Sequence, residues 1–341
     1  MKRLLPVALI GLLLMSASLA GFWYHYQQFL QTPMNIEEPG LVVMVEPGTN
    51  IRSVVMNLEQ QGVTRLDWRW RLLGRLRPVV IKTGEYGLTA GLSPPGLLDL
   101  LASGKVLSHR FTIVEGWSIK QLLDALGTDP VLQHTVTDVT ELEDLAGFPE
   151  GHPEGWFLPE TYSFVRGDSD LEILRRAYNA MLESLAMVWA GRDTGLPYET
   201  PYELLIMASI IEKETSLESE RADIAGVFVR RLLKHWRMET DPTVIYGMGE
   251  AYQGNIRRRD LKMDTPYNTY TRHGLPPTPI ALAGLASLQA AAHPADGDAM
   301  FFVADGKGGH TFSSTLEAHN EAVRELISQT KDKPAETGTQ K

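Results

Sequence analysis

The chain contains no cysteine among its 341 residues. That absence excludes disulfide bonds, thiolate metal sites, cysteine nucleophiles and a lipoprotein anchor. A basic surplus is absent too, because 32 lysines and arginines stand against 42 aspartates and glutamates, a formal net charge of −10. Binding to a phosphate backbone needs a basic surface, so we do not expect nucleic acid as a partner.

Several common catalytic motifs are also missing. There is no Gly-x-Ser-x-Gly elbow and no His-Glu-x-x-His zinc motif. Gly247-Met248-Gly249 is followed by Tyr252 where a dinucleotide-binding loop needs its third glycine. The nine histidines show no ligand spacing, and His310 and His319 favour a structural role over metal binding. We therefore expect neither a metal nor a cofactor.

The N-terminus has the pattern of a membrane helix. Residues 1–3 include Lys2 and Arg3, whereas residues 4–23 carry no charge and would span roughly 30 Å as a helix. Aromatic residues follow, as in an interfacial belt, and the basic end is expected in the cytoplasm. The sequence predicts a single-pass helix over residues 4–23 in the inner (cytoplasmic) membrane, with the rest of the chain outside the cytoplasm. A cleaved signal peptide, cut after Ala20, remains an alternative.

The remaining chain predicts an α+β protein with a small α/β module at residues 40–149 and a larger mixed α+β domain at residues 150–329. Residues 31–39 are expected to form a linker, and residues 330–341 a disordered tail. The small module contains two similar strand-turn-helix units with a Val-Glu-turn-cap order. The first has a strand at 41–46, a cap at Thr49 and a helix closed by Gly62; the second has a strand at 110–115, a cap at Ser118 and a helix to Leu126.

In the larger domain, helices are predicted over 171–189 and 225–236, and between them a helix runs from Thr200-Pro201 to Ile211. Glu203 completes a capping box with Thr200, and Pro201 occupies the first helical position. Residues 300–304 and 310–312 predict a hairpin, followed by a helix capped at Ser314–Glu317. The helix that ends at Ile211 is apolar on nearly every face, which is typical of a buried helix.

Glu212 lies at the end of that buried helix, on the same face as Ala208 and Leu205. Burial favours the protonated form of a carboxyl group, and a general acid must hold its proton. The alternative is that Glu212 is the solvated edge of the helix, together with Lys213 and Glu218. Glu214 lies about 200° further round the helix, so the two glutamates do not share a face.

Six sequence blocks then resemble one family. In order they are Glu154-Gly155-Trp156-Phe157-Leu158-Pro159-Glu160-Thr161-Tyr162, Leu205-Ile206-Met207-Ala208-Ser209-Ile210-Ile211-Glu212-Lys213-Glu214-Thr215, Thr240-Asp241-Pro242-Thr243-Val244-Ile245-Tyr246-Gly247, Tyr267-Asn268-Thr269-Tyr270, Gly274-Leu275-Pro276-Pro277-Thr278-Pro279-Ile280 and His310-Thr311-Phe312-Ser313. Together they resemble the endolytic murein transglycosylase (MltG-like, YceG-like) family over roughly residues 41–326. The pattern departs from the family at 281–284, where Ala-Leu-Ala-Gly replaces Asn-Pro-Gly, and at 238–239, where Met-Glu replaces Leu-Gln.

The resemblance implies that Glu212 is the single catalytic glutamate and that the small module holds a LysM-like peptidoglycan-binding subdomain, for which residues 110–126 are the better candidate. Sugar contacts are expected from the neighbouring blocks, with packing as the competing role, and with Trp156 assigned to packing. The expected substrate-binding residues are Glu160, Thr161, Tyr162, Glu214, Asp241, Tyr267, Asn268, Thr269 and Tyr270.

The function expected from these residues is a lytic transglycosylase that cuts the bond between N-acetylmuramic acid and N-acetylglucosamine in nascent peptidoglycan. Such an enzyme needs one carboxyl group, because the C6 hydroxyl of the substrate itself is the nucleophile. The expected partners are glycan strands, the membrane and the peptidoglycan synthases (penicillin-binding proteins). Two alternatives remain: a non-catalytic membrane-anchored scaffold that binds peptidoglycan, and a hydrolase in which a second carboxylate, such as Glu160, Glu214 or Asp241, assists Glu212.

Overall fold

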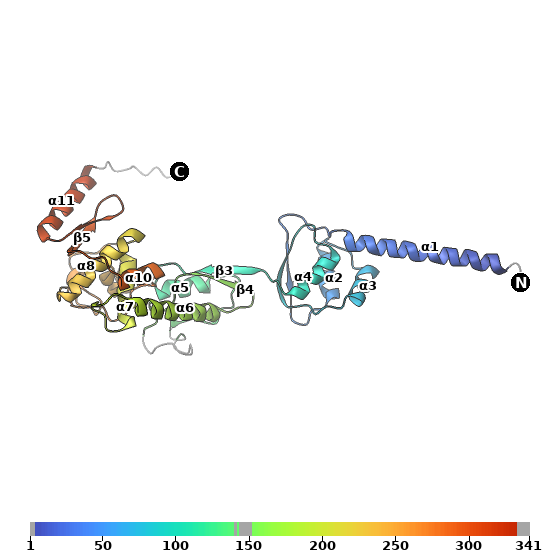
Figure 1. Cartoon of the computed structure of the whole chain (residues 1–341), viewed down its shortest axis with the longest axis horizontal. Coiled ribbons are helices and arrows are strands. Elements are labelled where there is room, and N and C mark those ends of the chain that lie inside the picture. The colour runs from blue at the N-terminus through green and yellow to red at the C-terminus, as the bar shows by residue number, and fades with distance from the viewer. Residues whose placement is uncertain (1–3, 140–141, 143–151, 333–341) are drawn as a thin grey trace. The chain divides into compact units, whose positions relative to one another are not determined.

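The computed structural model describes residues 4–139, 142 and 152–332, in which helices predominate and strands occur in three pairs (Figure 1). Contacts divide the chain into two compact units. The first holds residues 1–109 together with 163–168, and the second holds 110–162 together with 169–341. The structure thus mixes helices and strands, as predicted. The division falls between His109 and Arg110, before the boundary at 149/150 that the sequence predicted.

The first unit is built around an antiparallel pair, β1 (Leu41–Val45) and β2 (Gly84–Leu88), in which Leu41 faces Leu88 and Val45 faces Gly84. Two helices connect these strands, α2 (Ile51–Gln60) and α3 (Trp68–Leu76), and α4 (Pro94–Ser103) follows. Inward-facing residues of both strands form a core with the helices, since Tyr86 and Leu88 are almost fully buried. The cap of α2 is the side chain of Asn50, one residue after the Thr49 that the sequence predicted.

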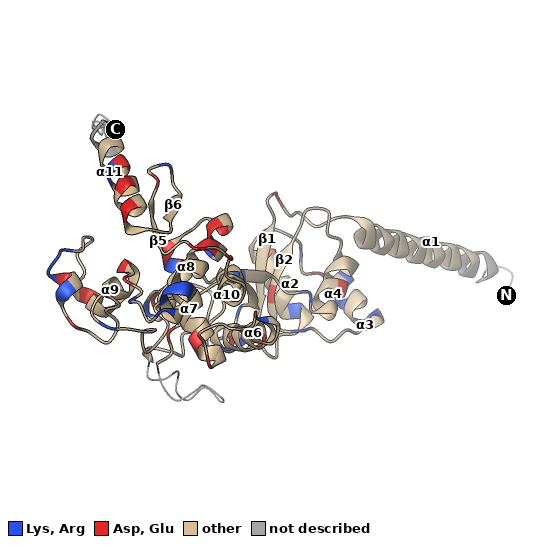
Figure 2. Ribbon diagram, turned by 60° about the vertical axis from the view of Figure 1, so that its left-hand side comes forward, with Lys and Arg blue, Asp and Glu red and all other residues tan. Residues whose placement is uncertain are grey.

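The helix α1 (Leu4–Gln31) confirms the N-terminal helix and is longer than the segment predicted to cross the membrane. It is long and apolar enough to cross a bilayer, and it is drawn without charged residues along its apolar part (Figure 2). Its last turns belong to the core of the first unit, because Tyr26 and Phe29 are buried there. The helix ends at Gln31, where the predicted linker begins.

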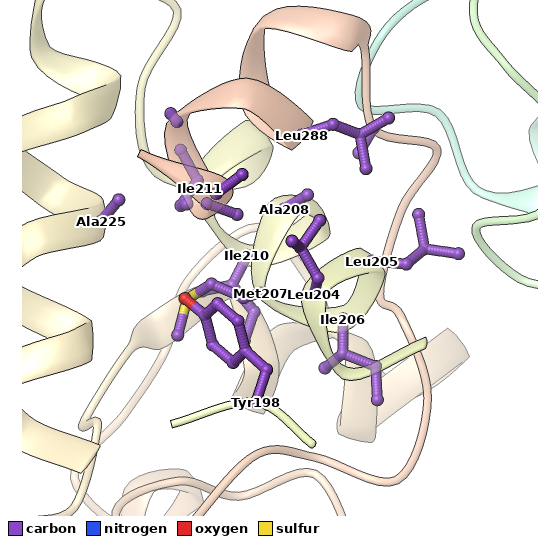
Figure 3. Packing of buried hydrophobic residues seen from close by; sticks show 14 of the residues in the cluster. Tyr198, Leu204, Leu205, Ile206, Met207, Ala208, Ile210, Ile211, Ala225 and Leu288 are labelled. Carbon is purple, nitrogen blue, oxygen red and sulfur yellow. The ribbon is translucent and has the colours of Figure 1, made fainter. Parts of the chain in front are cut away.

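The second unit is organised around α7 (Pro201–Glu214), which packs against α6 (Asp170–Gly191), α8 (Arg221–Leu233), α9 (Asp241–Met248) and α10 (Leu285–Ala292). Every residue of α7 from Leu204 to Ile211 is buried, which confirms the prediction of a buried helix (Figure 3). The predicted capping box of Thr200 and Glu203 is present. This unit also contains α5 (Ile119–Gly127), with its predicted cap at Ser118.

Short elements complete the structure. Strands β3 (Ser108–Thr112) and β4 (Thr161–Val165) pair where the chain passes between the two units. The predicted hairpin is confirmed as β5 (Phe301–Ala304) and β6 (His310–Ser313), and α11 (Leu316–Asp332) follows. The hydroxyl of Thr315 accepts a bond from the backbone of Ala318 at the start of α11. This helix extends into the predicted disordered tail, of which residues 333–341 lie outside the described part. Single turns of 3₁₀ helix are η2 (Glu218–Glu220), η3 (Gly249–Ala251) and η4 (Asp260–Lys262).

Candidate active site around Glu212

The buried helix α7 presents Glu212 in its last turn. Its side chain is only 5% exposed, although it follows directly on the apolar run that ends at Ile211. A solvated helix edge would leave such a side chain in water, so the structure contradicts that alternative. Because the helix is held on four sides by other helices, the position of the Glu212 carboxyl group is set by packed structure and not by a loop.

Two groups contact the Glu212 carboxyl group. The backbone N–H of Gly284 donates a hydrogen bond to Oε2 at 3.0 Å, and Nη2 of Arg221 lies 3.5 Å from Oε1. Arg221 begins α8 and is itself buried, with 7% of its surface exposed. A backbone amide and a guanidinium both favour negative charge on the carboxyl group, so the site can stabilise Glu212 after it has given up a proton.

A second carboxylate shares the same guanidinium. Oε2 of Glu115 also lies 3.5 Å from Nη2 of Arg221. Burial and the negative charge of Glu212 raise the pKa of Glu115, and Arg221 opposes that rise. The structure therefore groups Glu115, Arg221 and Glu212, whereas the sequence had left Glu160, Glu214 and Asp241 as candidates for a second carboxylate.

The sequence carries a signal for Glu115. Glu115 is the glutamate in the Val-Glu-turn-cap order of the second strand-turn-helix unit, directly before the Gly116 turn. Lys213, the neighbour of Glu212 on α7, donates from Nζ to the backbone oxygen of Gly116 at 3.0 Å. The repeated strand-turn-helix pattern predicts the local fold of this unit. Within it, Glu115 before the turn carries the negative charge that lies near Arg221.

The segment 281–284, where the sequence departs from the family pattern, forms part of this site. Ala281, Leu282 and Ala283 are fully buried. Leu282 exchanges two backbone hydrogen bonds with the turn, accepting from Gly116 at 2.8 Å and donating to Trp117 at 2.7 Å. Gly284 follows and donates to Glu212. The departure therefore lies at the centre of the site, where it connects the Glu115 turn to α7.

Replacing Gly284 by alanine is expected to lower the rate of catalysis about tenfold with little change in stability. A Cβ at this position would lie 2.0 Å from Oε1 of Glu115, and the half-exposed Glu115 side chain can move away at low cost, leaving Arg221. The measurement is the cleavage rate together with the urea midpoint of unfolding. Gly127→Ala is the matched control, since nothing lies within 4 Å of that added Cβ. Equal rates for both variants would mean that the place of Glu115 beside Arg221 does not affect the rate.

Glu154 holds the start of α5 beside the Glu115 turn. It is 1% exposed, and its carboxyl group accepts from the backbone N–H of Ile119 at 3.0 Å and from the hydroxyl of Tyr246 at 3.2 Å. Burial raises the pKa of Glu154 to about 7, against the lowering effect of these hydrogen bonds. Glu154 thus fixes the N-terminus of α5 and exchanges a proton near neutral pH.

This raised pKa predicts a pH dependence of stability. Between pH 4.5 and about 7 the native chain keeps a proton on Glu154 that the unfolded chain has released. The free energy of unfolding should therefore fall as pH rises through that window. Glu214 has a pKa raised to about 7 by burial and contributes with the same sign, whereas the lowered pKa values of His152 and His319 contribute with the opposite sign. Glu154→Gln should therefore make the slope less negative. Urea unfolding at pH 4.5 to 7.5 measures it, and an unchanged slope in the variant would contradict the assignment.

Three of the predicted substrate-binding residues meet on another side of α7. Glu214 accepts a hydrogen bond from the hydroxyl of Thr240, and the hydroxyl of Tyr270 donates to Oδ1 of Asp241 at 2.6 Å. The charge of Asp241 adds to the burial that raises the pKa of Glu214. Glu214 and Glu212 therefore have different partners, as the helical geometry predicted, and Glu214, Asp241 and Tyr270 form a group separate from Arg221.

Asn268 and Thr269, which precede Tyr270, form hydrogen bonds inside the protein. Asn268 is 1% exposed, and its amide donates to the backbone oxygens of Leu261 and Met263, while its carbonyl accepts from the backbone of Tyr270. Thr269 is 2% exposed and bonds to Thr240. The polar atoms of Asn268 and Thr269 are thus buried and bonded within the protein, which favours the alternative role of loop support over sugar contact. Tyr267, partly buried, shares a hydrogen bond with the hydroxyl of Thr278.

The three residues from the first block lie at the start of β4. Glu160 and Thr161 are exposed, and Glu160 accepts from the backbone N–H of Thr161 at 3.0 Å. Tyr162 is partly buried and donates its hydroxyl to the backbone oxygen of Leu158 at 2.8 Å. Trp156 stacks on Tyr202 with ring centres 5.4 Å apart, in agreement with the packing role predicted for it.

His310 of the hairpin and His319 of α11 each contact a neighbouring side chain. His310 pairs with Glu220 at 2.7 Å, and the ring of His319 stacks on Phe301. Within the ranges 4–139 and 152–332, no group of three or more histidine, aspartate or glutamate side chains is arranged to hold a metal ion.

Comparison with known proteins shows which family the chain resembles. Residues 43–325 match the model of the YceG-like family. The endolytic murein transglycosylase of Bacillus subtilis (strain 168) is 38% identical over 183 residues, which cover 53% of this chain and 50% of that protein. The protein of the same name from Streptococcus pneumoniae (strain ATCC BAA-255 / R6) is 25% identical over 348 residues, covering 90% of this chain and 63% of that protein.

Among solved structures, the crystal structure of a yceG-like protein from Listeria monocytogenes matches with a TM-score of 0.52 and 28% identity, over 84% of this chain and 99% of that chain. The two curated relatives are longer than the part that matches, since the chain covers less than two thirds of the length of each.

Proposed function

This chain belongs to the YceG-like family, and from that premise we propose that it is a lytic transglycosylase that cleaves peptidoglycan glycan strands with Glu212 as acid and then base. The observation that carries the proposal is the Glu212 carboxyl group, almost fully buried at the end of α7 and bonded by Gly284 beside Arg221. The names of the Bacillus and Streptococcus relatives support the substrate class and the reaction.

In the proposed reaction, protonated Glu212 donates its proton to the oxygen between C1 of N-acetylmuramic acid and C4 of N-acetylglucosamine. The C1–O bond breaks, and the leaving sugar keeps the proton as its C4 hydroxyl group. The C6 oxygen of the same muramic acid then attacks C1 while its proton passes to Glu212. The product is a 1,6-anhydro end, Glu212 is protonated again, and no water is consumed. The nucleophile is already part of the substrate, which favours ring closure.

Arg221 and Gly284 have a defined task in this cycle. Between the two proton transfers Glu212 is negatively charged, and positive charge develops at C1. The guanidinium of Arg221 and the N–H of Gly284 stabilise that anion in a buried setting, where such contacts are stronger than in water. Glu115 adds a second negative group near Arg221, which favours a positively charged sugar ring close by.

The position of Glu115 also supports a second candidate function, hydrolysis of the same bond. A glycoside hydrolase usually has two carboxyl groups beside the glycosidic bond, and its nucleophile is either water or one of these carboxylates. In that reaction the product has a reducing end. A non-catalytic scaffold remains the third possibility and predicts no cleavage by the purified protein.

The test is product analysis by mass spectrometry of uncrosslinked glycan strands incubated with the detergent-solubilised full chain. Tyr26 and Phe29 belong to the core of the first unit, so removal of all of α1 would disturb that core. Anhydro ends are the expected result. Reducing ends would replace the proposal by hydrolysis with Glu115 as the second carboxylate, and intact strands would favour the scaffold.

Three further expectations complete the proposal. The helix α1 is apolar and mostly exposed, which supports the expectation that it anchors the chain in the inner membrane with both units on the extracytoplasmic side. The first unit has its own core and a strand-helix-helix-strand order, which supports Leu41–Leu88 as the LysM-like glycan-binding part in place of residues 110–126. Glu160 and Thr161, which are exposed, stay candidates for sugar contacts, and peptidoglycan synthases stay the expected protein partners.

A further inference from the structure

A cavity of about 640 Å³ lies in the first unit between α1, α2 and α3. Phe22 of α1 forms one wall, and its ring stacks on Trp68 of α3 with centres 4.2 Å apart. Apolar side chains of α2 and α3, such as Val55 and Leu72, form another part of the wall. The volume is in the range of sites that bind small molecules, and the apolar wall suits hydrocarbon chains.

Three arginines also line this cavity: Arg52 of α2, and Arg71 and Arg75 of α3. All three are exposed, and within the described part of the chain none has a carboxylate partner. Two other arginines of this unit do have carboxylate partners: Arg69 pairs with Asp67, and Arg77 pairs with Asp99. In the described part of the chain, the positive charge of the three arginines at the cavity is therefore not neutralised by a carboxylate.

This charge contrasts with the rest of the chain. Between Arg52 and Arg77 there are six arginines and two acidic residues, Glu59 and Asp67, whereas the whole chain carries −10. Figure 2 shows basic residues on this unit beside the uncharged α1. A local cluster of positive charge attracts anions. It does not serve solubility here, because the chain already carries a large negative net charge.

The position of the cavity along α1 identifies the kind of ligand. Leu4 to Trp23 carry no charge, and as a helix they have about the length of the hydrocarbon core. With this segment across the membrane, Phe22 would lie where the hydrocarbon ends and the lipid headgroups begin. Exposed Trp23 and Tyr24 lie at the same level, as aromatic residues do at a membrane interface.

We propose that this cavity binds an anionic phospholipid of the outer face of the membrane, with its phosphate on Arg52, Arg71 and Arg75 and its acyl chain along the wall at Phe22 and Trp68. The proposal rests on the proposed membrane anchor, not on the chemistry at Glu212. Arginine suits the role because its planar guanidinium bonds phosphate oxygens in pairs. A bound lipid would join α1 to α3 and hold the first unit at the membrane surface.

The test uses the detergent-solubilised full chain and native mass spectrometry with added phosphatidylglycerol or phosphatidylcholine. The chain is expected to bind phosphatidylglycerol at least tenfold more tightly than phosphatidylcholine, and the variant Arg52→Gln/Arg71→Gln/Arg75→Gln should lose that preference. Arg257→Gln/Arg258→Gln/Arg259→Gln is the matched control, because it removes the same charge from exposed positions in the second unit and should keep the preference. Circular dichroism checks that both variants are folded.

Two competition experiments separate other occupants. Displacement of phosphatidylglycerol by a polyprenyl diphosphate at tenfold lower concentration would overturn the phospholipid assignment in favour of a lipid-linked substrate. Displacement by soluble glycan strands would assign the cavity to sugar. Equal binding of the two phospholipids, or an unchanged preference in the cavity variant, would also overturn the proposal. The proposed reaction is tested by the anhydro ends that the wild type forms, and the lipid site by the phospholipid preference of the cavity variant, so either proposal can fail without the other.

Discussion

The variant Glu212→Gln is expected to form anhydro ends at least a thousandfold more slowly than the wild type. Glutamine has the same shape and can still accept the hydrogen bond from Gly284, but it neither donates a proton to the glycosidic oxygen nor takes one from the C6 hydroxyl group. General acid–base catalysis contributes about a hundredfold to ten-thousandfold, and here one residue serves both transfers. The measurement is the initial rate of anhydro product by mass spectrometry.

Glu183→Gln provides the matched control, because Glu183 is exposed on α6 in the same unit and the change in charge is the same. It should keep the wild-type rate. Urea unfolding should give Glu212→Gln a free energy of unfolding within about 1 kcal/mol of the wild type, because Arg221 keeps Glu115 as a partner, so that a loss of rate is not a loss of fold. Anhydro ends formed at the wild-type rate by Glu212→Gln would exclude Glu212 as the proton donor.

The second large effect is expected for Arg221→Met. This substitution leaves the carboxyl groups of Glu115 and Glu212 together without the guanidinium that lies 3.5 Å from each. The loss of one partner from a buried ion pair costs about 3–5 kcal/mol of stability, and the rate should fall about a hundredfold because the anion of Glu212 loses its cation.

A pH profile distinguishes this electrostatic role from a packing role. Arg221 lowers the pKa of Glu115, so its removal should raise that pKa further and move the acid limb of the rate profile to higher pH. The double variant Arg221→Met/Glu115→Gln should regain part of the lost stability, since only one carboxyl group then remains. Arg221→Lys keeps the charge and should lie between wild type and Arg221→Met. An unshifted profile and no rescue by Glu115→Gln would mean that Arg221 acts by packing alone.

Much of the local structure could be predicted because it depends on neighbours in the sequence. The uncharged run from Leu4 to Trp23 determines an apolar helix, which does not depend on contacts with the rest of the chain. The capping box at Thr200 and Glu203 determines where α7 begins. The apolar residues up to Ile211 determine that this helix is buried, which identified Glu212 as a carboxyl group in unusual surroundings.

The tertiary structure alone decided what surrounds that carboxyl group. Periodicity shows that a face is covered but not which segment covers it, so Glu115, Arg221 and Gly284 could not be assigned to one site from spacing. The same limit affected Asn268, whose residue type suits a sugar contact, while the fold turns its amide onto three backbone carbonyl groups.

The boundary between the units was also a tertiary property. Composition changes near residue 150, but the turn at Gly116 bonds to Leu282 and Glu154 bonds to Ile119, which bind the segment from Arg110 onward to the second unit. The sequence by itself thus determined the N-terminal helix, the capped starts of α5 and α7, and the acid at the end of α7. The long-range contacts that determine the proton chemistry of that acid join residues far apart in the chain, and only the folded protein brings them together.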